Sequence, residues 1–145
     1  TSPGDYLALD GNLSYVDLRN TSDKGTFGRY EGDRVPNRPY LFANSSARGM
    51  VHSLLRRGDE LSLTWYLRWV HEFWRYWSRD GNPSTKLAIP KQTTHALVLM
   101  YSTMFERWGL DASLECQNVA DARVYDNFGV QRPGRSFWLK LTGRR

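Results

Sequence analysis

The sequence predicts an all-β protein built around an antiparallel up-and-down sheet of six strands. The first observation is a period-two alternation of apolar and polar residues in six separate segments, which is typical of strands with one apolar and one polar side. The second is that the connections between these segments alternate between long and short. The chain has 145 residues, enough for one domain with its own core.

The first expected strand shows the alternation most simply. Leu7, Leu9 and Leu13 fall on one side, and Asp10 and Asn12 fall on the other. The same pattern recurs in five later segments. The six expected strands are 6–15, 39–51, 61–77, 94–102, 110–118 and 136–143.

The third segment, "LSLTWYLRWVHEFWRYW" at 61–77, first needs a choice between helix and strand. Trp65, Trp69 and Phe73 recur every four residues, a spacing that fits a helix locally. Leu63 and Leu67 lie halfway between those positions, so on a helix they would point to the far side, whereas on a strand they share the apolar side. We therefore expect one strand over 61–77, with these residues on its apolar side. Tyr66, Arg68 and Glu72 are expected on its polar side.

The connections follow the order long, short, long, short, long. The long ones run from the first expected strand to the second, from the third to the fourth, and from the fifth to the sixth. The short ones contain "RRGDE" and "TMFER". This order is typical of a meander whose two ends face different surroundings, as in outer-membrane barrels with short turns on one side and long loops on the other.

The alternation by itself fits two kinds of protein. An antiparallel sheet with one wet side shows the same period of two in a soluble protein. A transmembrane barrel strand shows it with lipid on one side and a polar lumen on the other. Aromatic residues near strand ends favour interfacial girdles, and the candidates are Tyr40, Trp77, Tyr101, Trp108 and Phe137. No run approaches the roughly 18 apolar residues that a membrane-spanning helix needs.

Several segments carry a resemblance to a known family. The tail "NVADARVYDNFGVQRPGRSFWLKLTG" at 118–143 resembles the C-terminal end of a TonB-dependent outer-membrane receptor. The segment "GDRVPNRPYLFAN" at 32–44 is similar to a loop-to-strand entry several strands earlier in that family, and "GDELSL" and "IPKQTTHALVLMY" follow in the expected order. The resemblance covers most of the chain.

The last strand carries the family's barrel-assembly pattern. Gly134, Phe137 and Leu139 match its spacing of glycine, plus three and plus five, and Leu141 continues the row. The simpler interpretation is a final strand that closes the sheet, and the two are compatible because closure removes exposed edges.

The resemblance implies a fold, a location and partners. It implies a multi-pass transmembrane β-barrel of about 22 strands around a plug domain in the bacterial outer membrane, with residues 1–145 as the C-terminal part of the barrel. Six strands cannot close such a barrel, so the plug domain and the N-terminal strands are expected on another chain. Further implied partners are the TonB complex through the plug, lipopolysaccharide, outer-membrane lipid and the barrel-assembly machinery.

The implied function is energy-coupled import of a scarce nutrient, such as a ferric siderophore or cobalamin, rather than catalysis. Aromatic residues of the long connections are candidates for stacking on a ligand, and arginines are candidates for holding anionic groups. The simpler role for each is a solvated loop residue, and Arg68 and Glu72 are expected to pair with neighbours or with the plug. The ligand candidates are Tyr30, Arg34, Trp74, Tyr76, Trp77, Tyr125 and Phe128, with Arg29, Arg75, Arg79 and Arg123 as further arginines.

Composition leaves two alternatives open. A net charge of +5 and an aromatic fraction of 14% fit a soluble nucleic-acid-binding barrel, although that function predicts arginines and aromatics on one shared face. A soluble barrel binding a small apolar ligand is the other. His52, His71 and His95 lack metal-ligand spacing, so no metal or cofactor is expected, and Cys116 is expected to be a small apolar side chain. No catalytic constellation stands out, and no nucleic-acid partner is expected.

Overall fold

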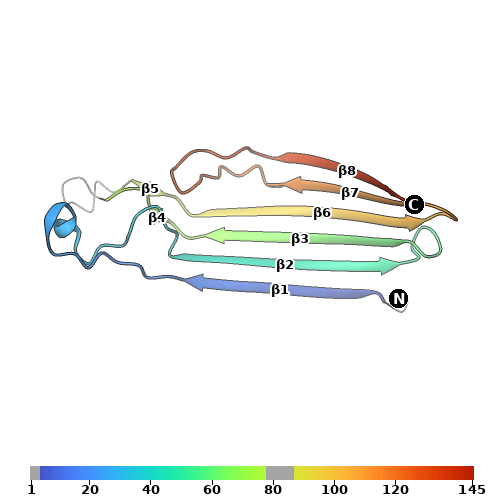
Figure 1. Ribbon diagram of the computed structural model, residues 1–145, viewed down its shortest axis with the longest axis horizontal. Coiled ribbons are helices and arrows are strands. Elements are labelled where there is room, and N and C mark those ends of the chain that lie inside the picture. The colour runs from blue at the N-terminus through green and yellow to red at the C-terminus, as the bar shows by residue number, and fades with distance from the viewer. Residues whose placement is uncertain (1–3, 78–86) are drawn as a thin grey trace.

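A single antiparallel sheet dominates the computed structural model, which describes residues 4–77 and 87–145 (Figure 1). Its six strands lie in the order β1-β2-β3-β6-β7-β8, so each main strand pairs with the next one along the chain. Strands β4 and β5 form a separate two-stranded sheet, and η1 is a 3-10 helix. The bounds are β1 Tyr6–Tyr15, η1 Gly25–Tyr30, β2 Leu41–His52, β3 Glu60–Val70, β4 Phe73–Trp74, β5 Ala88–Ile89, β6 Gln92–Met104, β7 Gly109–Gln117 and β8 Ser136–Arg144.

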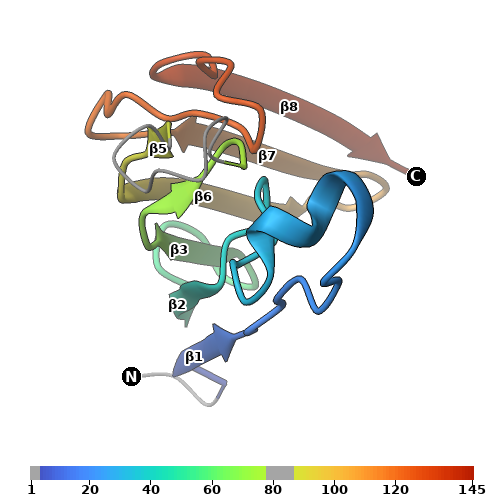
Figure 2. The same cartoon turned by 90° about the vertical axis from the view of Figure 1, so that its left-hand side faces the viewer.

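The sheet is open, and its strands lie on an arc when it is viewed from one end (Figure 2). Strands β1 and β8 form its two edges, and each pairs with only one strand among the described residues. The expectation of an all-β antiparallel meander is therefore confirmed, while the described part of this chain does not close a barrel on itself. None of the helical structure in the described ranges is long and apolar enough to cross a membrane.

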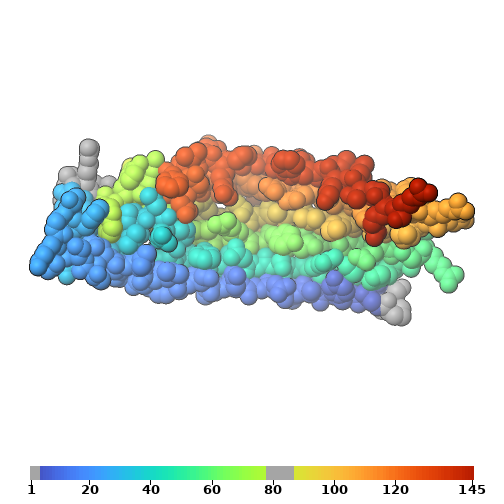
Figure 3. Space-filling model, in the orientation of Figure 1, coloured from blue at the N-terminus to red at the C-terminus, as the bar shows by residue number. Residues whose placement is uncertain are grey.

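The connections divide the molecule into two unlike ends, as the sequence predicts. Connections 16–40, 71–91 and 118–135 leave the sheet at one end, which we call the loop end, and turns 53–59 and 105–108 join strands at the other, the turn end (Figure 1). The start of β1 and the end of β8 also lie at the turn end. In the space-filling view the blue 16–40 connection extends the molecule at the loop end (Figure 3).

The strand register places every alternating segment in phase with its neighbours. One row across the sheet runs Leu7, Gly49, Leu63, Leu99, Leu114 and Leu139, with one residue from each of the six strands. The next row runs Leu9, Ala47, Trp65, Leu97, Cys116 and Phe137. We call the side that carries these rows the apolar face. The polar face, on the other side, carries Asp10, Asn44, Arg68, Thr94 and Glu115, among others.

The third strand is shorter than the sequence predicts. Strand β3 ends at Val70, and His71 donates its backbone N–H to the carbonyl of Leu41 at 3.0 Å. Phe73 then starts the short strand β4, where it pairs with Ile89 instead of extending the sheet. The expectation of one strand to Trp77, with Phe73 on the apolar face, was therefore wrong, because burying Phe73 beside Val70 turns the chain away from the sheet.

A small apolar core lies where the chain leaves the sheet after β3. Val70, Phe73 and Ile89 are buried, and Phe73 is only 2% exposed. Tyr40, Phe42 and Tyr125 pack around them. Since Tyr125 belongs to the 118–135 connection, this core ties that connection to the sheet.

The two short turns are held by different contacts. In turn 53–59 the buried carboxylate of Asp59 accepts hydrogen bonds from the backbone N–H groups of Leu55 and Arg56 and from the Tyr101 hydroxyl. In turn 105–108 the rings of Phe105 and Trp108 stack at 4.1 Å. Trp108 and Tyr101 thus lie at the turn end, and Tyr40 lies at the loop end, where girdle residues are expected.

The core predicts unequal effects for two phenylalanines. Phe73→Ala removes a fully buried ring, a change that typically costs about 3–5 kcal/mol, so we expect the contact between sheet and connection 118–135 to loosen. Hydrogen exchange of amides in 118–135 should speed up by about tenfold or more. Phe128→Ala is the matched control, because Phe128 is 64% exposed on the same connection. Equal exchange rates in the two variants would contradict this role for the core.

Candidate functional site

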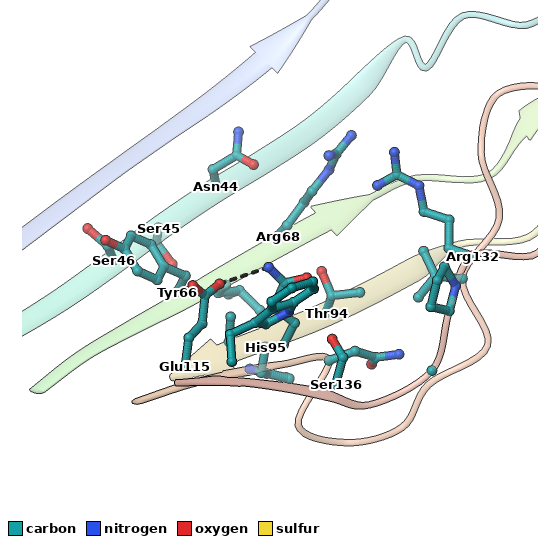
Figure 4. A pocket seen from close by; sticks show the side chains of 18 of the residues that line it. Asn44, Ser45, Ser46, Tyr66, Arg68, Thr94, His95, Glu115, Arg132 and Ser136 are labelled. Atoms are coloured by element: carbon teal, nitrogen blue, oxygen red, sulfur yellow. Dashed lines mark hydrogen bonds between the residues drawn. The ribbon is translucent and has the colours of Figure 1, made fainter. Parts of the chain in front are cut away.

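The polar face of the sheet forms the floor of a groove of 960 Å³ (Figure 4). Strands β1, β2, β3, β6, β7 and β8 all contribute side chains to it, because the even-numbered residues of five of these strands and the odd-numbered residues of β7 share this face. Residues 132–134 of the 118–135 connection supply one of its walls. A cavity of this size lies in the range that holds a medium-sized organic ligand.

The 118–135 connection is folded back and fixed at several points. Asn118, at the end of β7, exchanges two side-chain hydrogen bonds with the backbone of Ala122. Asp121 accepts the backbone N–H of Arg135 at 2.8 Å. Between these points, the backbone N–H of Tyr125 donates to the side-chain oxygen of Gln92 on β6. The connection is therefore a built part of the groove and not a loose loop.

A second cavity, of 320 Å³, continues the groove towards the loop end. Arg68, Thr94, Val124 and Arg132 line both cavities, so they stand at the junction between them. Asp126 also lines the second cavity, and its Oδ1 accepts the backbone N–H groups of Phe128 and Val130, which closes the tip of the connection.

Charges in the groove are separated along the strand direction. Arg68 lies near the loop end of β3, and Arg132 reaches the same junction from the connection. The carboxylates of Asp10 and Glu115 lie nearer the turn end, in the cross-strand rows of Tyr66 and Thr64. Glu115 accepts a hydrogen bond from Gln117 at 2.8 Å, drawn as the dashed line in Figure 4. The junction is therefore the cationic end of the groove.

The structure brings two of the predicted ligand residues together in the loops. Tyr30 stacks on Trp77 with ring centroids 5.1 Å apart, and Phe27 leans on the same indole at 6.3 Å. The guanidinium of Arg29 lies 4.9 Å from the Tyr30 ring centroid. Tyr30 is only 5% exposed, so this cluster joins connection 16–40 to the segment that follows β4 and leaves little of the Tyr30 ring open to a ligand.

Arg34, another predicted ligand residue, is held by its own connection. Its guanidinium lies 4.0 Å from the Tyr40 ring centroid, and its Nε contacts Asp17 at 2.9 Å. Its Nη2 donates to the Tyr15 hydroxyl at 3.1 Å. Hydrogen bonds from Arg34 and then from Arg19 lower the pKa of Asp17 below its usual range, and Asp17 in turn raises the pKa of Arg34. Arg34 thus closes the base of connection 16–40.

The remaining ligand candidates are distributed over the loop end. Trp74 lies in β4, and its backbone carbonyl accepts the N–H of Asn37 at 2.8 Å. Tyr76 is 48% exposed beneath the Arg75 guanidinium, whose side chain also lies against Gly129. Tyr125 and Phe128 both line the 320 Å³ cavity, and of the candidates only these two do so.

Two of the further arginine candidates remain. Arg123 is exposed on the 118–135 connection. Arg79 lies outside the described residues.

The residues of the expected assembly pattern lie at the start of β8 and along it. A Cβ on Gly134 would come within 2.5 Å of the Asp121 carboxylate, which explains the glycine at this close approach. Phe137, Leu139 and Leu141 lie on the apolar face with exposures of 66%, 70% and 64%. This geometry is that of an exposed apolar row, and the assembly role stays a prediction.

Sequence reasoning missed Arg132, which lines both cavities. Its only sequence signal is its place before Pro133 and Gly134, where the chain re-enters the sheet. Arg68 was expected to pair with a neighbour or with the plug, but its guanidinium has no hydrogen bond or ion pair with any residue in 4–77 and 87–145. Across the same ranges no group of three or more histidine, cysteine or acidic residues is placed to hold a metal ion.

The chain was compared with known protein families, curated proteins and solved structures. A scan against protein-family models and searches of curated proteins and of solved structures find no match to the chain.

The contacts of Asp17 predict a pH dependence for connection 16–40. Because the pKa of Asp17 is lowered in the folded protein, its contribution to stability is present above the usual aspartate pKa of about 4 and is lost as the pH falls through the lowered value. Arg34→Gln should raise the pKa of Asp17 in a carboxyl-carbon NMR titration. Arg19→Gln should raise it less, because Arg34 is the larger cause. A larger shift in Arg19→Gln would contradict the arrangement.

Proposed function

We propose that this chain forms the C-terminal part of the barrel wall of a TonB-dependent outer-membrane receptor, which imports a scarce nutrient by energy-coupled transport. The observation that carries the proposal is the exposed apolar face. In one row alone, Leu7, Leu63, Leu99, Leu114 and Leu139 are 71%, 50%, 41%, 47% and 70% exposed. A sheet surface of this kind is stable against hydrocarbon and costly against water.

The contrast between the two faces supports lipid over an aqueous environment. A soluble sheet with one wet side buries its apolar side against a second layer. Here Leu7, Leu9 and Leu13 on the apolar face are 71%, 72% and 71% exposed, while Ser62 and Thr64 on the polar face are only 3% and 8% exposed. The nucleic-acid alternative gives no reason for the exposed leucine face, which also carries Trp65 and Trp69.

The dimensions of the sheet fit a membrane as well. The six main strands have 9 to 13 residues, and a tilted transmembrane strand needs about 9–11. Long connections at one end and short turns at the other correspond to the outer and periplasmic sides of such barrels. On this proposal the loop end faces outward.

The open edges support the proposal that other strands complete the wall. Strands β1 and β8 each leave one side of their backbone without a strand partner among the described residues. Unpaired backbone N–H and C=O groups cannot remain in hydrocarbon, so a membrane-embedded sheet must be continued at both edges. We propose that strands on another chain close a barrel of about 22 strands, with a plug domain in its lumen.

In this proposal the nutrient enters from the loop end. The long connections and the plug catch the ligand, and the TonB complex supplies the energy that rearranges the plug. Phe128 and Tyr125, which line the smaller cavity, are the candidates from this chain best placed to contact it.

Cys116 provides a native probe of the apolar face. It is the chain's single cysteine and lies in the row of Leu97 and Phe137. In native membranes we expect it to resist a charged methanethiosulfonate reagent, because hydrocarbon excludes the charged reagent. Reaction should follow once the membranes are dissolved and the protein is denatured.

The matched control is the neighbouring position on the opposite face. Gln117→Cys in a Cys116→Ser background places a thiol in the groove, so it should react in intact membranes. If Cys116 reacts there as fast as the cysteine at 117, the apolar face meets water and the proposal fails.

The proposed assembly also predicts the size of the native particle. The chain has a mass of 16.8 kDa, and if other strands complete the barrel, detergent extraction should yield a stable complex several times heavier. Native mass spectrometry would measure it and identify the second chain. A stable 16.8 kDa monomer released into buffer without detergent would exclude the receptor.

A further inference from the structure

We propose that Arg68 and Arg132 form a binding site for an organic oxyanion at the junction of the two cavities on the polar face. The site deepens the proposed function, on which its transport role rests, by assigning a chemical class of ligand to this part of the wall. It also assigns the anion contacts to two arginines that were not expected to bind the ligand, Arg68 on β3 and Arg132 on the 118–135 connection. Three observations carry the assignment.

The first observation is that the two arginines line the same junction and that their guanidinium groups are not paired with other described residues. Both line the 960 Å³ groove and the 320 Å³ cavity. Neither guanidinium has a hydrogen bond or ion pair within residues 4–77 and 87–145, whereas Arg34 and Arg144 are each paired with an aspartate. Two like charges facing one space repel each other, and an anion between them removes that repulsion.

The second observation is that the nearby carboxylates are engaged or distant. Asp126 lines the smaller cavity, but its Oδ1 accepts two backbone N–H groups at 2.8 and 2.9 Å. Glu115 is bonded to Gln117, and its cross-strand row lies four residues from Arg68 along β3, about 13 Å away. The positive charge at the junction is therefore not neutralised by these groups.

The third observation is that the position of Arg132 is fixed by the fold. Its backbone N–H donates to the carbonyl of Val124 at 2.8 Å, next to the bridge between Tyr125 and Gln131. Tyr125 is in turn bonded to Gln92 and packed on the core. Arg68 stands on β3 with Asn44 and Thr94 as its cross-strand neighbours. Two guanidinium forks on rigid elements suit carboxylate or phosphate oxygens, which they bind in a bidentate manner.

Two aromatic side chains in the groove indicate what the rest of the ligand can be. Tyr66 lies two residues before Arg68 on the same face, about 7 Å away, and is 47% exposed. Trp138 lines the same groove from β8 with 61% exposure. Rings at these positions can stack under a flat or apolar body whose anionic group is held at the junction. The ligand class is therefore an organic anion with at least two oxyanion groups or one oxyanion group and a flat body.

Binding of citrate and of pyrophosphate to the purified native complex tests the site. Calorimetry at low salt should detect binding that weakens as salt is added. Arg68→Gln and Arg132→Gln should each weaken it by about tenfold or more, since each removes a charge-assisted contact. Arg57→Gln is the matched control, because Arg57 is exposed at the turn end, outside the groove, and it should bind like the unmodified protein.

The outcomes separate this inference from the proposed function. Tighter binding of citrate assigns a carboxylate ligand, and tighter binding of pyrophosphate assigns a phosphate ligand. If neither binds at millimolar concentration, or if Arg57→Gln weakens binding as much as Arg68→Gln, the site is overturned. Cys116 protection, measured in native membranes before the complex is extracted, reports separately on membrane insertion, so a protected cysteine with no anion binding refutes the site alone.

Discussion

The constraint on which the structure depends is the register of six antiparallel strands. Side chains alternate between the two faces of a strand, so a shift of one residue in any pairing would turn a whole strand over. Here all five pairings keep the apolar residues in phase, and Leu7 and Leu139 end one continuous row although they stand at opposite edges. Because that row is exposed, the register also creates the two unlike surfaces from which the proposed location and the groove both follow.

The polar face can carry a cavity because no second layer of the residues in 4–77 and 87–145 packs on that side to fill it. The 118–135 connection covers part of it instead, held by Asn118, Asp121 and the contact between Tyr125 and Gln92. These are mostly hydrogen bonds between side chain and backbone, which orient a segment without burying much apolar surface. The small core around Phe73 supplies the apolar part of the attachment. The connection can therefore present Arg132 at a fixed place and still leave the groove open.

The sequence predicted the regular parts of the fold well, for a physical reason. A period of two is a local property of a strand, so 6–15 and the later segments could be recognised one by one, and the long and short connections then gave their order. The predicted end of the third strand was wrong because the alternation continues through Phe73. The burial of that ring beside Ile89 depends on residues that lie far along the chain. Tertiary packing of this kind leaves no periodic signal.

The candidate site shows the same division between local and distant information. Aromatic and arginine residues in the long connections could be named from composition, but their partners could not. Tyr30 and Arg34 turned out to be occupied by contacts within their own end of the molecule, with Trp77 and Asp17. Arg68 and Arg132 are separated by more than sixty positions in the sequence, and only the folded connection brings them to one junction. An arginine whose own fold supplies no carboxylate remains available to an external anion, whereas one that has already been paired serves mainly to shape the protein. The distinction that matters for function is therefore which cations the fold leaves unpaired, and this depends on long-range contacts that residue type and spacing do not encode.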